Sequence, residues 1–266
     1  KKETFYATLN EGLNKVATYP AAKDKLLEMY NKRDPRMMAS IIMPYTTYKG
    51  WYSNAPMDTE YVITEKSGQT NEKNGFIRVN GNYEMYLWRK FVAEYDMNGA
   101  INNREDTPIN FPLIRYADVL LMYAECLIET DGDKQLAADL INQVRYRAFV
   151  TTSLTDSYAK YRKFNLKESD RVTEDTFNAK YKVKASDDLR AAVRHERRIE
   201  LAGEGLRFYD LIRWGTFVST MQKFGKTDEG KYSGAGTLVT DKTYPYPIPQ
   251  SEIDYVGGAL TQNDNY

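Results

Sequence analysis

Two runs of helical hydrophobic periodicity, separated by a short turn, constrain the fold of this chain more than any other feature. Between residues 113 and 129 apolar residues recur every three or four positions, and the same spacing returns between 136 and 144. The segment DGDK at 131–134 separates the two runs and has the composition of a tight turn. The pattern therefore predicts two antiparallel helices that form an αα-hairpin over 113–148.

A second helical hairpin is predicted over 187–219. Apolar positions run from Leu189 to Ala202, GEG at 203–205 supplies the turn, and apolar positions continue from Leu206 to Phe217. The first hairpin is about the size of one tetratricopeptide (TPR) unit, roughly 34 residues. We therefore expect a mainly α fold in which TPR-like helical hairpins form an α-α superhelix.

The other segments predict shorter elements. Residues 1–33 have a helical pattern, and residues 149–186 are polar with room for one short helix. Residues 37–112 are rich in Tyr, Asn, Gly and Thr and have no helical period, which predicts long irregular loops with a few short strands. Three prolines at 245–249 predict that residues 240–266 form an extended, non-helical C-terminal strap.

The composition excludes several classes of function. Lys and Arg together number 37, as do Asp and Glu, so the chain lacks the basic excess expected of a nucleic-acid-binding protein. No run of 18 apolar residues predicts a membrane span, and KKETFYATLN at the start lacks the features of a signal peptide. The single cysteine, Cys126, excludes an internal disulfide and a cysteine-based zinc site. Because Cys126 lies in an apolar helical run, we expect a buried, inert thiol.

The stretch HERRIELAGEGLRFYDLIRWG at 195–215 is the most charged candidate site. His195 could act as a general base beside Glu196 or Glu200, and paired carboxylates could serve glycoside hydrolysis. Residues 194–215 also supply arginines that can pair with these glutamates: Arg194, Arg197, Arg198, Arg207 and Arg213. Arginine pairs bidentately with carboxylates, so we favour a packed ion-pair scaffold that locks two helices together, without a catalytic role.

Two acidic segments could supply oxygen ligands to calcium, DGD at 131–133 and NNRED at 102–106. Neither has the alternating spacing of an EF-hand loop, and a helix–helix turn explains the first. We therefore expect no metal site and no cofactor.

Aromatic residues in the loop-rich region are the best candidates for ligand binding. The chain has 22 tyrosines, and sugars stack their C–H faces on aromatic rings while polar side chains bind their hydroxyls. YTTYKGWYSN at 45–54 has this composition, and NGNYEMYLW at 80–88 is a second candidate. The predicted ligand-binding residues are Tyr45, Tyr48, Trp51, Tyr52, Tyr83 and Tyr86. The alternative, that these rings pack the loops onto the helices, stays open.

Six motifs occur in a specific order along the chain. They are RDPRM at 33–37, LIRYADVLLMYAECLIE at 113–129, LINQVRYRA at 140–148, RHERRIELAGEGLRFYDLIRWG at 194–215, YPIPQSEI at 246–253 and LTQNDNY at 260–266. Together they resemble the C-terminal half of a SusD/RagB-family protein. Members of this family are nutrient-binding outer-membrane lipoproteins of Bacteroidetes, and most bind glycans. The resemblance also implies that RKF, which follows Trp88, is a framework element and that the 194–215 stretch belongs to the scaffold.

The resemblance implies a fold, a location and a partner. It implies that residues 1–266 are the C-terminal region of a SusD-like domain whose N-terminal half is absent, with the ligand region at 37–112. It implies a cell-surface position at the outer membrane through a lipid-modified cysteine that this chain does not contain. It further implies a SusC-like TonB-dependent transporter as partner, in nutrient uptake and polysaccharide utilisation, with an oligosaccharide or polysaccharide as ligand.

The expected function is thus non-catalytic glycan capture. Three alternatives stay open: a RagB-like peptide-binding capture subunit on the same scaffold, a glycoside hydrolase that uses Glu196 and Glu200, and a cytosolic TPR scaffold.

Overall fold

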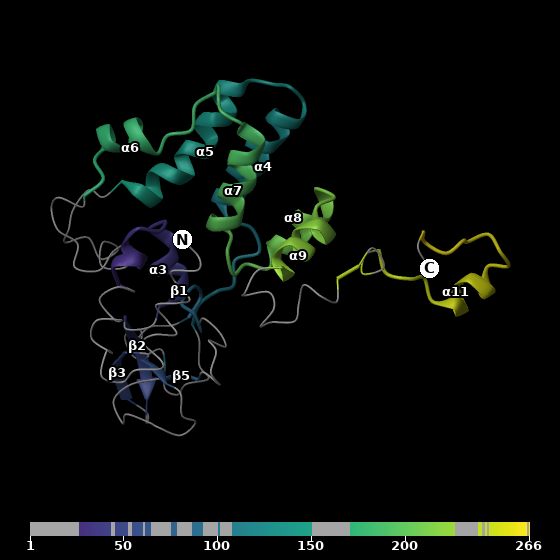
Figure 1. The fold of residues 1–266 in the computed structure, drawn as a ribbon, viewed down its shortest axis with the longest axis horizontal. Coiled ribbons are helices and arrows are strands. Elements are labelled where there is room, and N and C mark those ends of the chain that lie inside the picture. Colours follow the sequence, from purple (N-terminus) through teal and green to yellow (C-terminus); the bar gives the residue numbers. More distant parts are fainter. Residues whose placement is uncertain are drawn as a thin grey trace. The chain divides into compact units, whose positions relative to one another are not determined.

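Helices are the main secondary structure in the described part of the chain, as the apolar periodicity predicts (Figure 1). The structure is a computed structural model that describes residues 27–43, 46–52, 55–60, 62–64, 76–78, 87–92, 101, 108–150, 171–226, 239–240, 243, 245–264 and 266. The chain divides into two compact units, Lys1–Gly203 and Glu204–Tyr266. The predicted mainly α fold class is confirmed.

The predicted hairpin over 113–148 is present as α4 (Tyr116–Glu129) and α5 (Lys134–Phe149). The turn between them begins with Asp131, whose φ of 51° lies in the left-handed region. Asp133 then caps α5, because its carboxylate accepts hydrogen bonds from two backbone N–H groups of the first turn. DGDK is therefore a helix–helix turn, as its composition predicts.

A third helix completes the core of the first unit. Helix α7 (Leu189–Glu200) packs against both α4 and α5. Its Val193 is fully buried in one hydrophobic cluster with Leu121 of α4 and Ile141 of α5. Burial of these apolar faces provides the main driving force that holds the three helices together.

The short helix predicted within 149–186 is α6 (Glu174–Lys180). Its Phe177 is buried and packs edge-on against Tyr146 of α5, with ring centroids 5.3 Å apart. The segment that follows α6 is bound to α5 by Asn142, whose side-chain amide exchanges two hydrogen bonds of 2.8 Å with the backbone of Val183.

Short strands and one short helix, α3 (Arg36–Ser40), occupy the described parts of region 37–112. Strands β1 and β6 pair antiparallel, β2 and β3 form an antiparallel hairpin, and β4 and β5 pair in parallel. Their bounds are Ile41–Ile42 (β1), Thr47–Tyr52 (β2), Ala55–Glu60 (β3), Val62–Thr64 (β4), Phe76–Arg78 (β5) and Leu87–Trp88 (β6). Of the helix predicted over 1–33, residues 27–31 are helical, and residues 1–26 lie outside the described part.

Two predictions for the C-terminal unit differ from the structure. The helix predicted from Leu206 to Phe217 ends early, as α8 (Leu206–Arg213), and Phe217 begins a separate helix, α9 (Phe217–Gly225). The physical reason is Gly215, whose φ of 64° turns the chain out of the helical conformation. Phe208 of α8 packs edge-on against Phe217 of α9, with ring centroids 5.1 Å apart.

The strap predicted over 240–266 is not wholly extended, because it contains α11 (Gln250–Tyr255). Pro249 occupies the N-cap position of α11, where the missing N–H of a proline costs the helix no hydrogen bond. The proline-containing segment before α11 is extended and pairs with the end of the chain. Gln262 exchanges two hydrogen bonds with the backbone of Ile248, and Asn263 donates one to the carbonyl of Tyr246.

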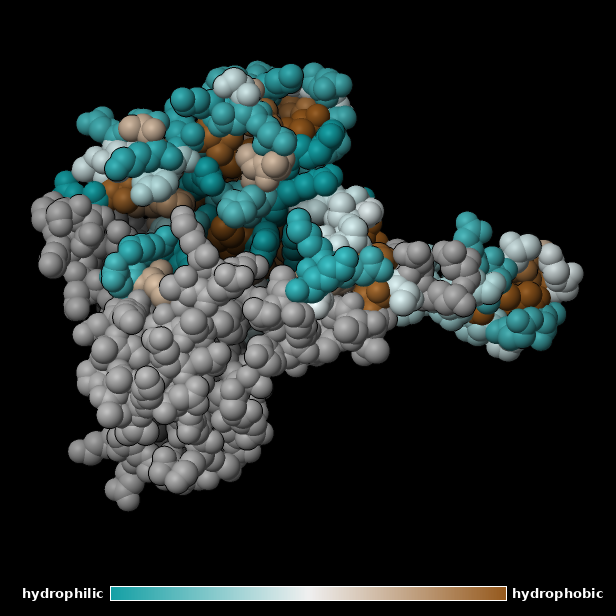
Figure 2. All heavy atoms as spheres, in the orientation of Figure 1, coloured by the Kyte–Doolittle hydropathy of each residue, from teal (hydrophilic) through white to brown (hydrophobic). Residues whose placement is uncertain are grey.

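The thiol of Cys126 is exposed, so the prediction of a buried cysteine is wrong. Helix α4 carries apolar residues on two faces. One face is buried against α5 and α7, while Tyr116, Val119 and Tyr123 lie exposed on the face that also carries Cys126. Figure 2 shows apolar residues, in brown, at the surface of the region where Figure 1 labels α4 and α5. Apolar content alone does not determine which face of such a helix is buried.

We expect Cys126 to react with a thiol reagent in the folded chain, because an exposed sulfur is accessible to it. The measurement is titration with Ellman's reagent in native buffer, compared with the same titration in guanidinium chloride. Native chain should reach the end point of the unfolded chain, and Cys126→Ser should give no signal. A thiol that reacts only after denaturation would contradict the exposed position.

Candidate functional site

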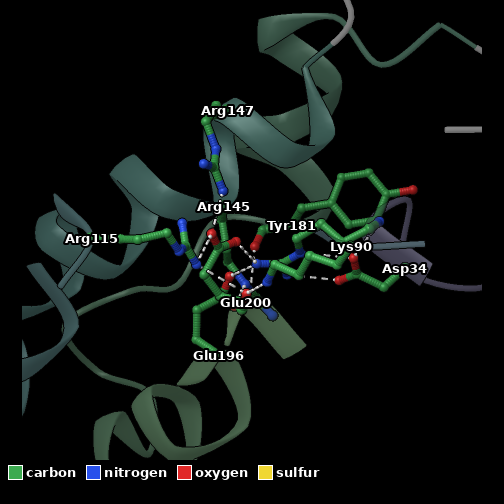
Figure 3. A network of polar contacts seen from close by, with 9 residues as sticks. Asp34, Lys90, Arg115, Arg145, Arg147, Tyr181, Glu196 and Glu200 are labelled. Atoms are coloured by element: carbon green, nitrogen blue, oxygen red, sulfur yellow. Dashed lines mark hydrogen bonds and ion pairs between the residues drawn. The ribbon is translucent and has the colours of Figure 1, made fainter. Parts of the chain in front are cut away.

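Two carboxylates on α7, Glu196 and Glu200, form the centre of a network of polar contacts (Figure 3). They lie one helical turn apart and are almost completely inaccessible, with side-chain exposures of 0% and 4%. Charged side chains are rarely this deeply buried unless they are paired. The partners of these two groups therefore decide what the site can do.

Both oxygens of Glu196 accept a hydrogen bond from an arginine. Arg36 donates from Nη1 to Oε1 at 2.5 Å, and Arg145 donates from Nε to Oε2 at 2.7 Å. Arg145 also donates to the carbonyl of Tyr181 at 2.7 Å. Glu196 thus joins α7 to α3 and α5.

Glu200 accepts from three arginines. Its Oε1 accepts from Arg147 at 2.6 Å and from Arg115 at 3.1 Å, and its Oε2 accepts from Arg36 at 3.1 Å. Arg36 directs the other side of its guanidinium to Asp34, with two bonds of 2.9 Å and 2.8 Å. This guanidinium therefore binds three carboxylates at once.

A second buried pair lies beside the first. Arg197 donates to Asp118 of α4 at 2.7 Å, and both side chains are buried. Arg197 also lies 4.0 Å from the carboxylate of Glu125. Asp118 and Glu125 lie on the buried face of α4, so this face carries acidic side chains as well as the apolar residues that pack against α5 and α7.

The ion-pair scaffold predicted for 194–215 is present, but its partners differ from the predicted ones. The partners of Glu196 and Glu200 come from outside the stretch, from α3, the residue before α4, and α5. Within the second unit, Asp210 of α8 pairs with Arg213, one turn along the same helix. The sequence signal for the distant partners was present, because Arg36, Arg115, Arg145 and Arg147 all lie in motifs that carry the family resemblance.

The network shifts the pKa values of Glu200, Asp34 and Arg36 away from their ordinary values. Burial would raise the pKa of Glu200, but the charges and hydrogen bonds of Arg147 and Arg36 outweigh it and lower this pKa. Burial likewise opposes ionisation of Asp34, and Arg36 reverses that effect and lowers its pKa. Burial would lower the pKa of Arg36, whereas Asp34 and Glu196 raise it. All three groups are therefore held in their charged forms at neutral pH.

These properties do not suit catalysis by Glu196 and Glu200. A glycosidase needs one protonated carboxyl group as general acid, and such a group has a raised pKa. The pKa of Glu200 is lowered, and both oxygens of Glu196 are occupied by guanidinium groups. His195, the other candidate, is exposed although its neighbour Glu196 is buried. The arrangement fits a scaffold whose charges are already neutralised.

The predicted aromatic site falls partly within the described residues. Tyr48, Trp51 and Tyr52 lie on β2, whose hairpin register pairs Tyr48 with Thr59, Trp51 with Pro56 and Tyr52 with Ala55. The structure therefore brings these three candidates together on one strand. The remaining candidates, Tyr45, Tyr83 and Tyr86, lie outside the described residues. The role of all six in ligand binding stays a prediction.

The acidic segments give no metal site within the described part of the chain, where no cluster of three or more His, Cys, Asp or Glu side chains could hold an ion. Asp133 of DGD uses its carboxylate to cap α5, and NNRED lies outside the described residues. None of the helices described here has the length and apolar character needed to cross a membrane.

Comparison with known proteins agrees with the motif order. The family model described as "SusD family" matches residues 3–266. SusD-like protein P25 of Formosa agariphila is 33% identical over 186 residues, which cover 70% of this chain and 28% of that protein. SusD-like protein P2 of the same organism is 28% identical over 225 residues, which cover 82% of this chain and 39% of that protein. The chain thus spans well under half the length of these curated relatives.

We expect Glu196→Gln to destabilise the fold by about 3 kcal/mol, because it leaves buried arginine charges without a carboxylate partner. Glu129→Gln is the matched control, since Glu129 pairs with Arg190 at 2.8 Å on the exposed surface. Loss of an exposed pair should leave the free energy of unfolding nearly unchanged. Urea denaturation followed by circular dichroism measures both variants, and equal unfolding midpoints would contradict the proposed importance of burial.

Stability should also fall in acid because of the lowered pKa of Glu200. The unfolded chain, with a Glu pKa of about 4.3, binds more protons than the folded chain as the pH falls through this range. The stabilisation is therefore complete above that value and is lost as the pH falls through the lower, folded-state pKa. Urea midpoints at pH 7, 5, 4 and 3 test this, and Glu200→Gln should flatten the pH dependence. An unchanged slope in Glu200→Gln would assign the acid sensitivity to other carboxylates.

Proposed function

Because this chain belongs to the SusD family, we propose that it is part of a non-catalytic, glycan-binding lipoprotein exposed on the surface of the outer membrane. In this role it acts as the capture, or lid, subunit of a SusC-like TonB-dependent importer. In this role a lipid anchor makes the membrane contact.

The observation that carries glycan binding is the concentration of aromatic residues on β2. Three of its six residues are aromatic, and the other three are Thr47, Lys49 and Gly50. Aromatic rings offer the flat apolar surface that the C–H face of a sugar ring requires, and neighbouring polar groups can bind its hydroxyls. A hairpin holds these residues in a defined register, which lowers the entropic cost of binding compared with a flexible loop.

The ion-pair network supports a binding function over hydrolysis. Glu196 and Glu200 are committed to arginines, and the buried face of α7 is occupied by packing against α4 and α5. The paired carboxylates considered from the sequence are therefore unavailable to a substrate. The glycan would then bind to the region between α3 and α4, and the helices would support that region.

We expect Trp51→Ala to weaken glycan binding by about fivefold, because removal of a stacking ring costs on the order of 1 kcal/mol. A glycan array identifies the ligand class, and isothermal titration calorimetry measures the affinity. Trp51→Phe, which retains an aromatic ring, should keep most of the affinity. Tyr255→Ala serves as control, since Tyr255 is an exposed aromatic residue of α11.

The outcomes separate the alternatives. Wild-type affinity of a folded Trp51→Ala variant would remove Trp51 from the site. Binding to a peptide library, with no glycan bound, would replace glycan capture by the RagB-like peptide function. Turnover of a bound glycan by the purified chain would overturn the non-catalytic proposal. A gene for a SusC-like transporter beside the gene for this protein would support the importer role.

A further inference from the structure

The half-exposed indole of Trp88 is the feature of the first unit that the scaffold does not explain. Its backbone is well anchored, because β6 pairs with β1 through Ile41, and the next residue, Arg89, donates its N–H to the carbonyl of Ser40 at 2.9 Å. Nevertheless 50% of the residue is accessible. The family resemblance implies that RKF, which follows Trp88, is a framework element, and that accounts for the backbone but not for an open aromatic ring.

One side of the Trp88 ring rests on Gly203, in the turn that follows α7. A Cβ atom placed on Gly203 would lie 3.0 Å from Cε3 and 3.1 Å from Cζ3 of the indole, closer than side-chain contacts normally allow. Gly203 also has a φ of 80°, which other residues rarely adopt. Only glycine therefore lets the backbone of this turn support the ring so closely.

Lys90 fixes the same turn in place. Its ammonium group donates to the carbonyl of Glu200 at 2.7 Å and to that of Ala202 at 3.3 Å. Since the side chain of Glu200 is held by three arginines, the buried network and Lys90 together determine where the turn, and hence Gly203, lies. The ring of Trp88 is thus supported by backbone that is itself tied to the core.

We infer that Trp88 is a stacking platform for a sugar ring, separate from the aromatic strand β2. The side of the indole away from Gly203 offers a flat apolar surface, which matches the C–H face of a pyranose. Because the ring is already ordered by Gly203, binding costs little side-chain entropy. The inference rests on the proposed function, since it takes the ligand to be a glycan, and it adds a named contact outside the predicted set of six residues.

Fluorine NMR of the chain without amino-acid substitutions tests the contact directly. The chain is labelled with 5-fluorotryptophan, which gives one resonance each for Trp51, Trp88 and Trp214, assigned through single Trp→Phe variants. The probes are maltohexaose, cellohexaose, xylohexaose, mannohexaose and laminarihexaose. The Trp88 resonance should shift and saturate with the hexasaccharide that binds.

Calorimetry with the same hexasaccharide gives the energetic test. Trp88→Ala should weaken binding by about tenfold, and Trp88→Phe should weaken it less, because a smaller aromatic face remains. Tyr123→Ala is the matched control, since Tyr123 lies on α4 with a nearly identical exposure of 49%. If Trp88→Ala does not fold, the fluorine spectra of the unmodified chain still decide the question.

The failures of the two proposals are distinguishable. If the unmodified chain binds none of the hexasaccharides and no glycan on the array, glycan capture itself is rejected, and the role of Trp88 with it. If a hexasaccharide binds while the Trp88 resonance stays fixed, or Trp88→Ala keeps wild-type affinity, only the stacking role of Trp88 is overturned.

Discussion

The arrangement of the first unit depends on the pairing of two buried glutamates of α7 with arginines from distant segments. Burying a charge costs several kcal/mol unless an opposite charge neutralises it, so Glu196 and Glu200 require partners at defined positions. Arg36 and Arg145 meet this requirement for Glu196, at 2.5 Å and 2.7 Å. Each pair is a distance constraint between elements far apart in the chain. Apolar packing brings α4, α5 and α7 together, and these pairs restrict how the helices and α3 can lie.

Because Glu196 and Glu200 are paired with arginines, they support the fold, and ligand binding is left to other residues. Glu196 and Glu200 are buried and paired with guanidinium groups, so a substrate has no access to them, and the lowered pKa of Glu200 removes it as a proton donor. The most charged motif of the chain is therefore the part least able to perform chemistry. Its effect on function is indirect, because Glu200 and Lys90 hold the turn at Gly203, on which Trp88 rests. The candidate contacts with a ligand lie on the short strands β2 and β6.

The candidate site could be predicted from the sequence only in part. Aromatic composition led to Tyr48, Trp51 and Tyr52, which the structure gathers on β2. Composition gave no reason to select Trp88, because the position of its ring depends on contact with Gly203, 115 positions later in the chain. Composition identifies aromatic residues that could bind sugars, but tertiary packing determines which of these rings are accessible to a ligand.

The sequence by itself determined the local elements: the helical period of α4, α5 and α7, the DGDK turn, and the ordered motifs that indicate the family. Helical periodicity and turn chemistry act over a few residues, so they can be read without a fold. Only the tertiary structure decided that Arg36 binds Glu196, 160 positions away, and that Cys126 lies on the exposed face of α4. The reason is physical: pairing and burial depend on which surfaces meet, and helix α4 has apolar residues on both of its faces.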